Sequence, residues 1–140
     1  MFDIVFENNT DFEPDLDLAK KIANDLDAGE IELILTDNSE IQEINLTARG
    51  KNQPTDVLSF PYEKMPHVPI GSIVISYDFI QSYSKEYNHT LNEEFTLLFI
   101  HGLLHLLGFD HEVDNGEHRA KEEELIVKYK LPESLIIRNT

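Results

Sequence analysis

Alternating and helical spacings of apolar residues divide the chain into strands and helices. Short runs that alternate, or that are rich in β-branched residues, predict strands, whereas apolar residues three and four apart predict helices. The strands are expected at 2–6, 30–36, 54–61 and 70–76. The helices are expected at 14–28, 38–50, 78–87, 90–107 and about 114–129. This order predicts an α+β fold, an α/β-like sandwich in which a mixed sheet of about four strands carries helices on its faces.

The helix expected at 90–107 is apolar on nearly every side. Thr90 and Glu93 have the spacing of a capping box, in which a hydroxyl and a carboxylate satisfy the first free N–H groups of a helix. A helix that is apolar nearly all round is buried in its protein. We therefore expect a central buried helix, which is a rigid support for any side chains that project from its end.

Three histidines lie at the end of this helix and just beyond it. His101 and His105 are four residues apart and so share one helix face, where both rings can reach one zinc ion at about 2.0–2.1 Å. Gly108 can adopt the left-handed conformation that ends a helix, so that the chain turns back and brings His111 to the same ion. Three protein ligands leave the fourth zinc position for water, as in catalytic sites. One Zn²⁺ ion is expected, and no other cofactor.

The residue after the first histidine separates this site from a protease. The spacing equals that of the metzincin motif, H-E-x-x-H-x-x-G-x-x-H, in which the glutamate is the general base. Gly102 occupies that position and has no side chain to carry a proton. The pattern therefore predicts a zinc hydrolase without the peptidase base. A zinc peptidase-like enzyme or a small-molecule metallohydrolase stays as an alternative.

Arg49, at the end of the second expected helix, is the candidate phosphate ligand. Its planar guanidinium matches phosphate oxygens with a fork of donors. A cation in the last turn of a helix is also favoured by the helix dipole, and the residues alone leave both interpretations open. The polar residues that follow it, Thr55, Asp56 and Ser59, are expected to cap turns or to bond the backbone from a buried hydroxyl.

Asp110 and the three remaining histidines carry weaker signals for a place in the metal site. Asp110, beside the third histidine, could orient an imidazole or cap a turn. His67, His89 and His118 fit no ligand spacing, and all three are expected at the surface.

Length and charge narrow the class of protein. The 140 residues are expected to form one zinc-dependent hydrolase domain, 1–140. Cysteine is absent, which excludes disulfides and thiolate ligands, and the acidic N-terminal residues are unlike a signal peptide, so a cytoplasmic setting without a membrane is expected. The 11 basic and 27 acidic residues give a net charge of −16, which taken alone argues against a nucleic-acid binder but does not exclude a local basic patch. This charge suits a basic protein partner at least as well as bare RNA.

Three motifs together are similar to those of one known family. Its hallmark H-G-x-L-H-L-x-G-y-D-H is matched by 101–111, with Phe109 in place of the usual tyrosine. Its P-T-D-V-L-S-F-P segment is matched without a break by 54–61. Its L-G-D-I-x-I-S segment corresponds to 70–76, where Ser72 replaces the aspartate. In these motifs, and in an Asn and an Arg ahead of the second one (Asn45 and Arg49), the chain resembles the YbeY family of bacterial rRNA-processing endoribonucleases.

The resemblance implies a metal-dependent endoribonuclease that prefers single strands and acts in ribosomal RNA maturation and ribosome quality control. It implies zinc on His101, His105 and His111, with Arg49 required beside the metal. The implied partner is a ribosomal RNA precursor, with the ribosome or small-subunit assembly proteins as further candidates. The expected nucleophile is a zinc-activated water or an RNA 2′-hydroxyl. A non-catalytic ribosome assembly factor stabilised by zinc stays as a further alternative.

Overall fold

The computed structural model describes residues 3–63, 65, 68–109 and 115–132. In chain order its elements are β1 (Ile4–Asn8), α1 (Leu16–Asp25), β2 (Ile31–Thr36), α2 (Asn38–Arg49), β3 (Val57–Pro61), β4 (Gly71–Ser76), α3 (Tyr77–Tyr87), α4 (Leu91–Leu106) and α5 (Glu117–Lys128). The strands form one sheet in the order β1-β2-β4-β3, in which β3 alone is antiparallel to its neighbour. The predicted α+β fold with a mixed four-stranded sheet is confirmed, and the segment bracketed by two prolines is an edge strand.

Most element boundaries differ from the sequence prediction by one to three residues, among them those of β1 and α5. β1 extends to Asn8 instead of ending at Phe6, because it pairs with β2 as far as Leu35. α5 has Gly116 at its N-cap position and no side-chain capping bond there, whereas Asp114, the predicted cap, lies outside the described residues.

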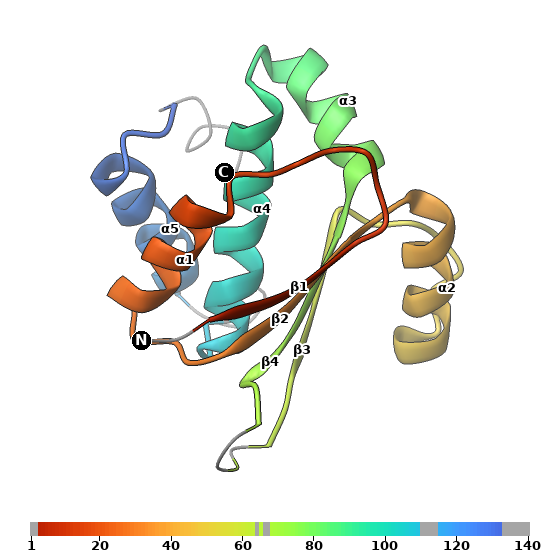
Figure 1. The fold of residues 1–140 in the computed structure, drawn as a ribbon, viewed down its shortest axis with the longest axis horizontal. Coiled ribbons are helices and arrows are strands. Elements are labelled where there is room, and N and C mark those ends of the chain that lie inside the picture. The colour runs from red at the N-terminus through yellow and green to blue at the C-terminus, as the bar shows by residue number, and fades with distance from the viewer. Residues whose placement is uncertain (1–2, 64, 66–67, 110–114, 133–140) are drawn as a thin grey trace.

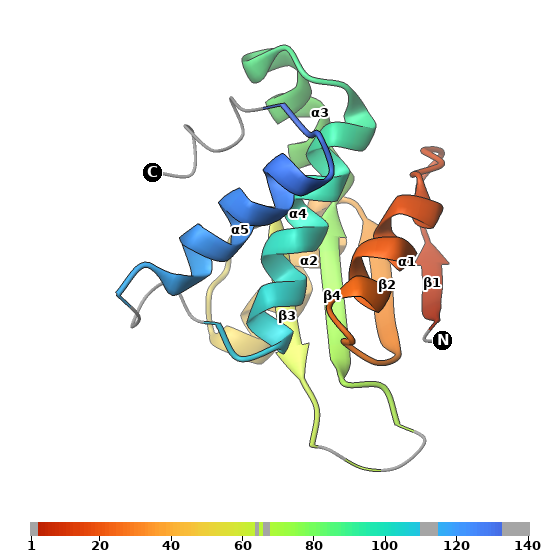
Figure 2. The same ribbon diagram turned by 90° about the vertical axis from the view of Figure 1, so that its left-hand side faces the viewer.

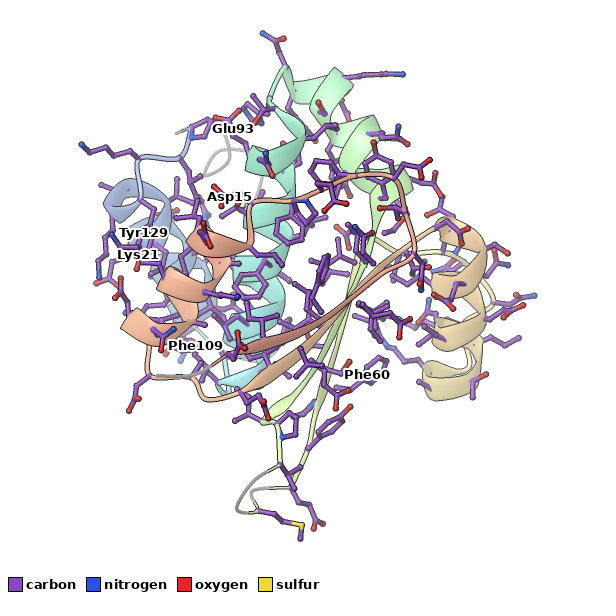
Figure 3. The ribbon with its side chains drawn as sticks, viewed as in Figure 1. Asp15, Lys21, Phe60, Glu93, Phe109 and Tyr129 are labelled. Atoms are coloured by element: carbon purple, nitrogen blue, oxygen red, sulfur yellow. The ribbon has the colours of Figure 1, made fainter. Side chains whose placement is uncertain are left out.

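Helices cover both faces of the sheet. α1, α4 and α5 lie on one side, and α2 lies on the other (Figure 1). The main core fills the space between the sheet and the first group of helices, with fully buried Ile31, Leu33, Ile73, Phe95 and Phe99 among its members. A smaller cluster beneath α2 contains Ile41, Leu58 and Val74. The side chains labelled in Figure 3 show the two layers, since Phe60 lies on the α2 side of the sheet and Phe109 on the other.

α4 is the central helix of the molecule. It lies between the sheet and α5, which crosses it on the side away from the strands (Figure 2). The capping box is present, since the Thr90 hydroxyl accepts from the Glu93 N–H at 3.1 Å and the Glu93 carboxylate accepts from the Thr90 N–H at 2.8 Å. Both the box and the burial of this helix confirm the prediction. None of the helices in the described ranges is long and apolar enough to cross a membrane.

Candidate metal centre and active site

Three imidazoles meet where the end of α4 faces the start of α5. The rings of His101 and His105, one turn apart on α4, have centroids 5.1 Å apart. The His118 ring, from α5, lies 4.6 Å from the first and 4.7 Å from the second. One ligand atom from each histidine can be chosen so that all three lie within 4.8 Å of one another. Imidazole nitrogens this close can hold one divalent metal ion such as zinc.

The surface position predicted for His118 is wrong. Only 1% of this residue is exposed. It begins the face of α5 that packs inward, which continues with Glu122, Leu125 and Ile126 at spacings of four, seven and eight residues. That helical spacing was the signal in the sequence, because a histidine on the same face as two buried aliphatic residues must be buried with them.

The surface position predicted for His89 is also wrong. This histidine lies away from the group formed by His101, His105 and His118. Its ring is 5% exposed, and its Nδ1 lies 2.8 Å from Oε2 of the buried Glu94. The pair joins the loop after α3 to the first turn of α4 and so has a structural place in the fold. The other sequence candidates in this group, Asp110, His111 and His67, lie outside the described residues.

Glu122 connects the histidines of the two helices. Its Oε1 lies 2.5 Å from Nδ1 of His101 and 3.2 Å from Nε2 of His118, and the residue is only 3% exposed. Burial by itself raises the pKa of Glu122, but the contacts with both histidines outweigh it and lower that pKa to about 2. Glu122 is therefore ionised at neutral pH, and as the acceptor of a hydrogen bond from Nδ1 of His101 it would leave Nε2 of that ring for a metal ion.

The same carboxylate affects the charge of His101. Burial lowers the pKa of this imidazole, but the hydrogen bond to Glu122, the charge of Glu122 and the charge of Asp56 together raise it above its usual range. Asp56 thus acts on the histidine from another part of the chain, a role that the sequence analysis did not foresee.

Gly108 ends α4 as the sequence predicts. Its φ is +99°, in the left-handed region. The Gly108 N–H donates to the His105 carbonyl at 3.1 Å, and the Phe109 N–H donates to the Leu104 carbonyl at 3.0 Å. These two bonds form a Schellman motif, which satisfies carbonyls that the end of a helix leaves open. The chain therefore turns sharply directly after the second histidine.

Gly102 lies where α4 packs closely on the sheet. A Cβ at this position would lie 2.9 Å from Cγ2 of Ile73 and 3.0 Å from Oγ of Ser59. The Ser59 hydroxyl donates to the Gly102 carbonyl at 3.0 Å, so it is the hydroxyl with a backbone partner that the sequence predicts. A glutamate at this position would collide with β3 and β4, which is why the peptidase base has no place in this fold.

A cavity of about 650 Å³ opens beside His101 and His105. Its wall comes from the end of α2, the segment through β3, and the end of α4; the residues are Arg49, Thr55, Asp56, Val57, Leu58, Ser59, Pro61, His101, His105, Gly108 and Phe109. The structure therefore brings Arg49 to the same cavity as two of the predicted metal ligands.

Arg49 satisfies the geometry of both interpretations that the sequence left open. It is the last residue of α2, where the helix dipole favours a cation, and its side chain also lines the cavity. Gly50, with φ of +70°, ends the helix directly after it. The position of Arg49 is thus compatible with contact to an anionic substrate.

Asp56 is held on both carboxylate oxygens at the wall of the cavity. Oδ1 accepts from the Val57 N–H at 2.8 Å, as predicted for a turn-capping residue. Oδ2 accepts from the Tyr83 hydroxyl at 3.1 Å, so α3 also fixes this carboxylate. Asp56 therefore places a fixed negative charge beside the histidines.

Comparison with known proteins identifies the family. The family model described as endoribonuclease YbeY matches residues 6–130. The chain belongs to the endoribonuclease YbeY family. A YbeY endoribonuclease of Aliarcobacter butzleri is 61% identical over 98% of this chain and 99% of its own length. A YbeY endoribonuclease of Nautilia profundicola is 57% identical over 97% of this chain and 98% of its own length.

A solved structure agrees with the fold of this YbeY family member. A Thermotoga maritima protein whose structure was determined in solution superposes with a TM-score of 0.60 at 27% identity, covering 91% of each chain. The family predicted from the three sequence motifs is confirmed, as is the prediction of an endoribonuclease.

Proposed function

We propose that this YbeY family member is a metal-dependent endoribonuclease that cleaves single-stranded segments of ribosomal RNA precursors during ribosome maturation and quality control. The observation that carries the proposal is the cavity shared by Arg49, His101 and His105, which combines a phosphate ligand with metal ligands. The activity printed in the names of its relatives supports the same reaction class.

The proposed metal is one Zn²⁺ ion held by His101, His105 and His111. Two of these donors fit this ion, since the rings of His101 and His105 are grouped with a third imidazole, that of His118, and the chain has no thiolate to offer. When bound, such an ion acts as a Lewis acid that makes a water or a 2′-hydroxyl more acidic and offsets charge on a phosphoryl group.

The protein side chains account for binding and orientation of the scissile phosphate. Arg49 offers a fork of donors to two phosphate oxygens and offsets the negative charge that grows on them. The hydrogen bond from His101 to Glu122 keeps that ring in one orientation. The fixed carboxylate of Asp56 repels a phosphate placed too deep in the cavity and so favours a position nearer Arg49.

The cavity fits an unpaired strand. Its volume of about 650 Å³ is within the roughly 300–1,000 Å³ of small-molecule sites, which is enough for nucleotides of an unpaired strand. Phe109 also lines it, and aromatic rings are typical of sites where unpaired bases stack.

The acidity of the chain limits the RNA interface. At −16, phosphate contacts must be few and local, so that binding of RNA alone is weak. Basic proteins of the ribosome or of the small-subunit assembly pathway are therefore proposed to bring the enzyme to its RNA. The proposed compartment is the cytoplasm. One domain, 1–140, carries the whole activity.

A peptidase on the same histidines is not favoured. A side chain at the position of the missing base would collide with Ile73 and Ser59. The proposed function is tested with metal-stripped protein. This protein is assayed on a single-stranded RNA, on its duplex and on a DNA of the same sequence. Cleavage of the single-stranded RNA alone, lost on chelation and restored by Zn²⁺, is expected. Full cleavage by the stripped protein would refute the metal requirement, and cleavage of peptides only would favour the alternative.

A further inference from the structure

A buried carboxylate outside the histidine motif contacts the group of three histidines. Oε1 of Glu122, on α5, lies 2.5 Å from Nδ1 of His101. The same oxygen lies 3.2 Å from Nε2 of His118, one turn earlier on α5. Both α5 residues are almost completely buried.

The polar pair lies on a helix face that is otherwise built for apolar packing. Leu125 and Ile126 continue the same face and are at most 2% exposed. Burying a carboxylate is costly unless charged or polar groups compensate for the loss of water, and an apolar residue would pack α5 on α4 without that cost. The presence of Glu122 is therefore better explained by the histidines that it contacts than by the packing of α5.

We propose that Glu122 is a positioning residue of the metal centre, which holds His101 with its proton on Nδ1 and its Nε2 towards the metal. The inference rests on the metal site of the proposed function. A carboxylate that accepts the second N–H of a ligating histidine fixes its tautomer and ring orientation and strengthens it as a ligand. His118, beside the same oxygen, closes the cluster on the α5 side.

The substitution Glu122→Gln tests the role of the charge while it keeps the size of the side chain. The matched control is Glu124→Gln, because Glu124 lies on the exposed face of the same helix, paired with Lys121. The Zn²⁺ dissociation constant is measured by competition with a chelator, together with the absorption spectrum of the Co²⁺-loaded protein and the unfolding of the metal-free protein. We expect Zn²⁺ binding about 10-fold to 100-fold weaker and an altered Co²⁺ spectrum for Glu122→Gln, with no change for Glu124→Gln.

Unchanged Zn²⁺ affinity in a folded Glu122→Gln variant would overturn the inference, even if the metal-free variant were less stable, because that result marks a purely structural residue. The wild-type protein gives a second test that needs no variant. In its Zn²⁺-loaded form, ¹⁵N chemical shifts should show His101 protonated on Nδ1 and metal-bound through Nε2, and metal bound through Nδ1 would overturn the inference. A wild-type protein that binds no metal would instead refute the proposed function itself.

Discussion

Arg49 and His105 line one cavity although their helices lie on opposite faces of the sheet (Figure 1). They can reach the same cavity because β3 is an edge strand, so that no further strand of the described residues separates the two layers on that side. The residues of β3 and the segment before it form the wall between them. A phosphate ligand from one layer and metal ligands from the other thus share a site at the free edge of the sheet.

Arg49→Ala should separate substrate handling from metal binding. We expect metal content to stay at the wild-type level and RNA cleavage to fall by about 10²-fold to 10³-fold, because a donor to the developing phosphoryl charge is lost. Arg119→Ala is the control, since Arg119 pairs with Glu123 on the outer surface of α5. Retained cleavage in Arg49→Ala would show that this residue only interacts with the helix dipole.

Two alanine variants decide which imidazole is the third metal ligand. We expect His111→Ala to lose the bound metal, as the motif predicts, and His118→Ala to keep one equivalent. The measurement is the metal content of each purified variant by elemental analysis. The reverse result would make His118, which lies within ligand distance of the other two rings, the third ligand in place of His111.

Gly102→Ala tests the close packing of α4 on the sheet. In an open helix this change stabilises by about 1 kcal/mol, because alanine is the better helix former. Here the new methyl group would lie 2.9 Å from Ile73, and overpacking of this kind costs about 1–3 kcal/mol. We therefore expect a net loss of unfolding free energy in urea titrations. A gain would show that the helix has room at this point.

The stability of the metal-free protein should depend on pH through Glu122 and His101. The pKa of Glu122 is lowered from 4.5 to about 2, so its contribution is present above pH 4.5 and is lost as the pH falls towards 2. The pKa of His101 is raised from 6.5, so its contribution is complete below pH 6.5 and is lost as the pH rises through the folded value.

The stability difference between the wild-type protein and Glu122→Gln should therefore be largest between pH 4.5 and 6.5. Urea unfolding in the presence of a chelator, at acidic, intermediate and alkaline pH, measures this difference. A difference that does not change with pH would contradict the ionic contact between the two side chains.

The sequence predicts most of the fold because its elements carry local signals. The capping box at Thr90 and the glycine at 108 mark the ends of α4, and their geometry depends only on residues close together in the sequence. Of the two outer strands, β1 is predicted by alternation and β3 by its flanking prolines.

The arrangement of the residues around the three histidines is harder to predict, because it depends on contacts between segments that are distant in the sequence. His118 and Glu122 follow the motif by several residues and reach His101 only when α5 folds across α4. Ligand spacing along one helix cannot reveal such a contact, whereas the buried face of α5 could have indicated it. Likewise, the link from Tyr83 to Asp56 joins α3 to the cavity and has no local sequence signal.

One histidine-bound metal ion should be required for RNA cleavage by this protein. Metal content and cleavage of a single-stranded ribosomal RNA precursor should be measured together on the wild-type protein and on His105→Ala. We predict one equivalent of zinc and cleavage for the wild-type protein, and loss of both for the variant. A His105→Ala protein that is free of metal and still cleaves at the wild-type rate would contradict the account.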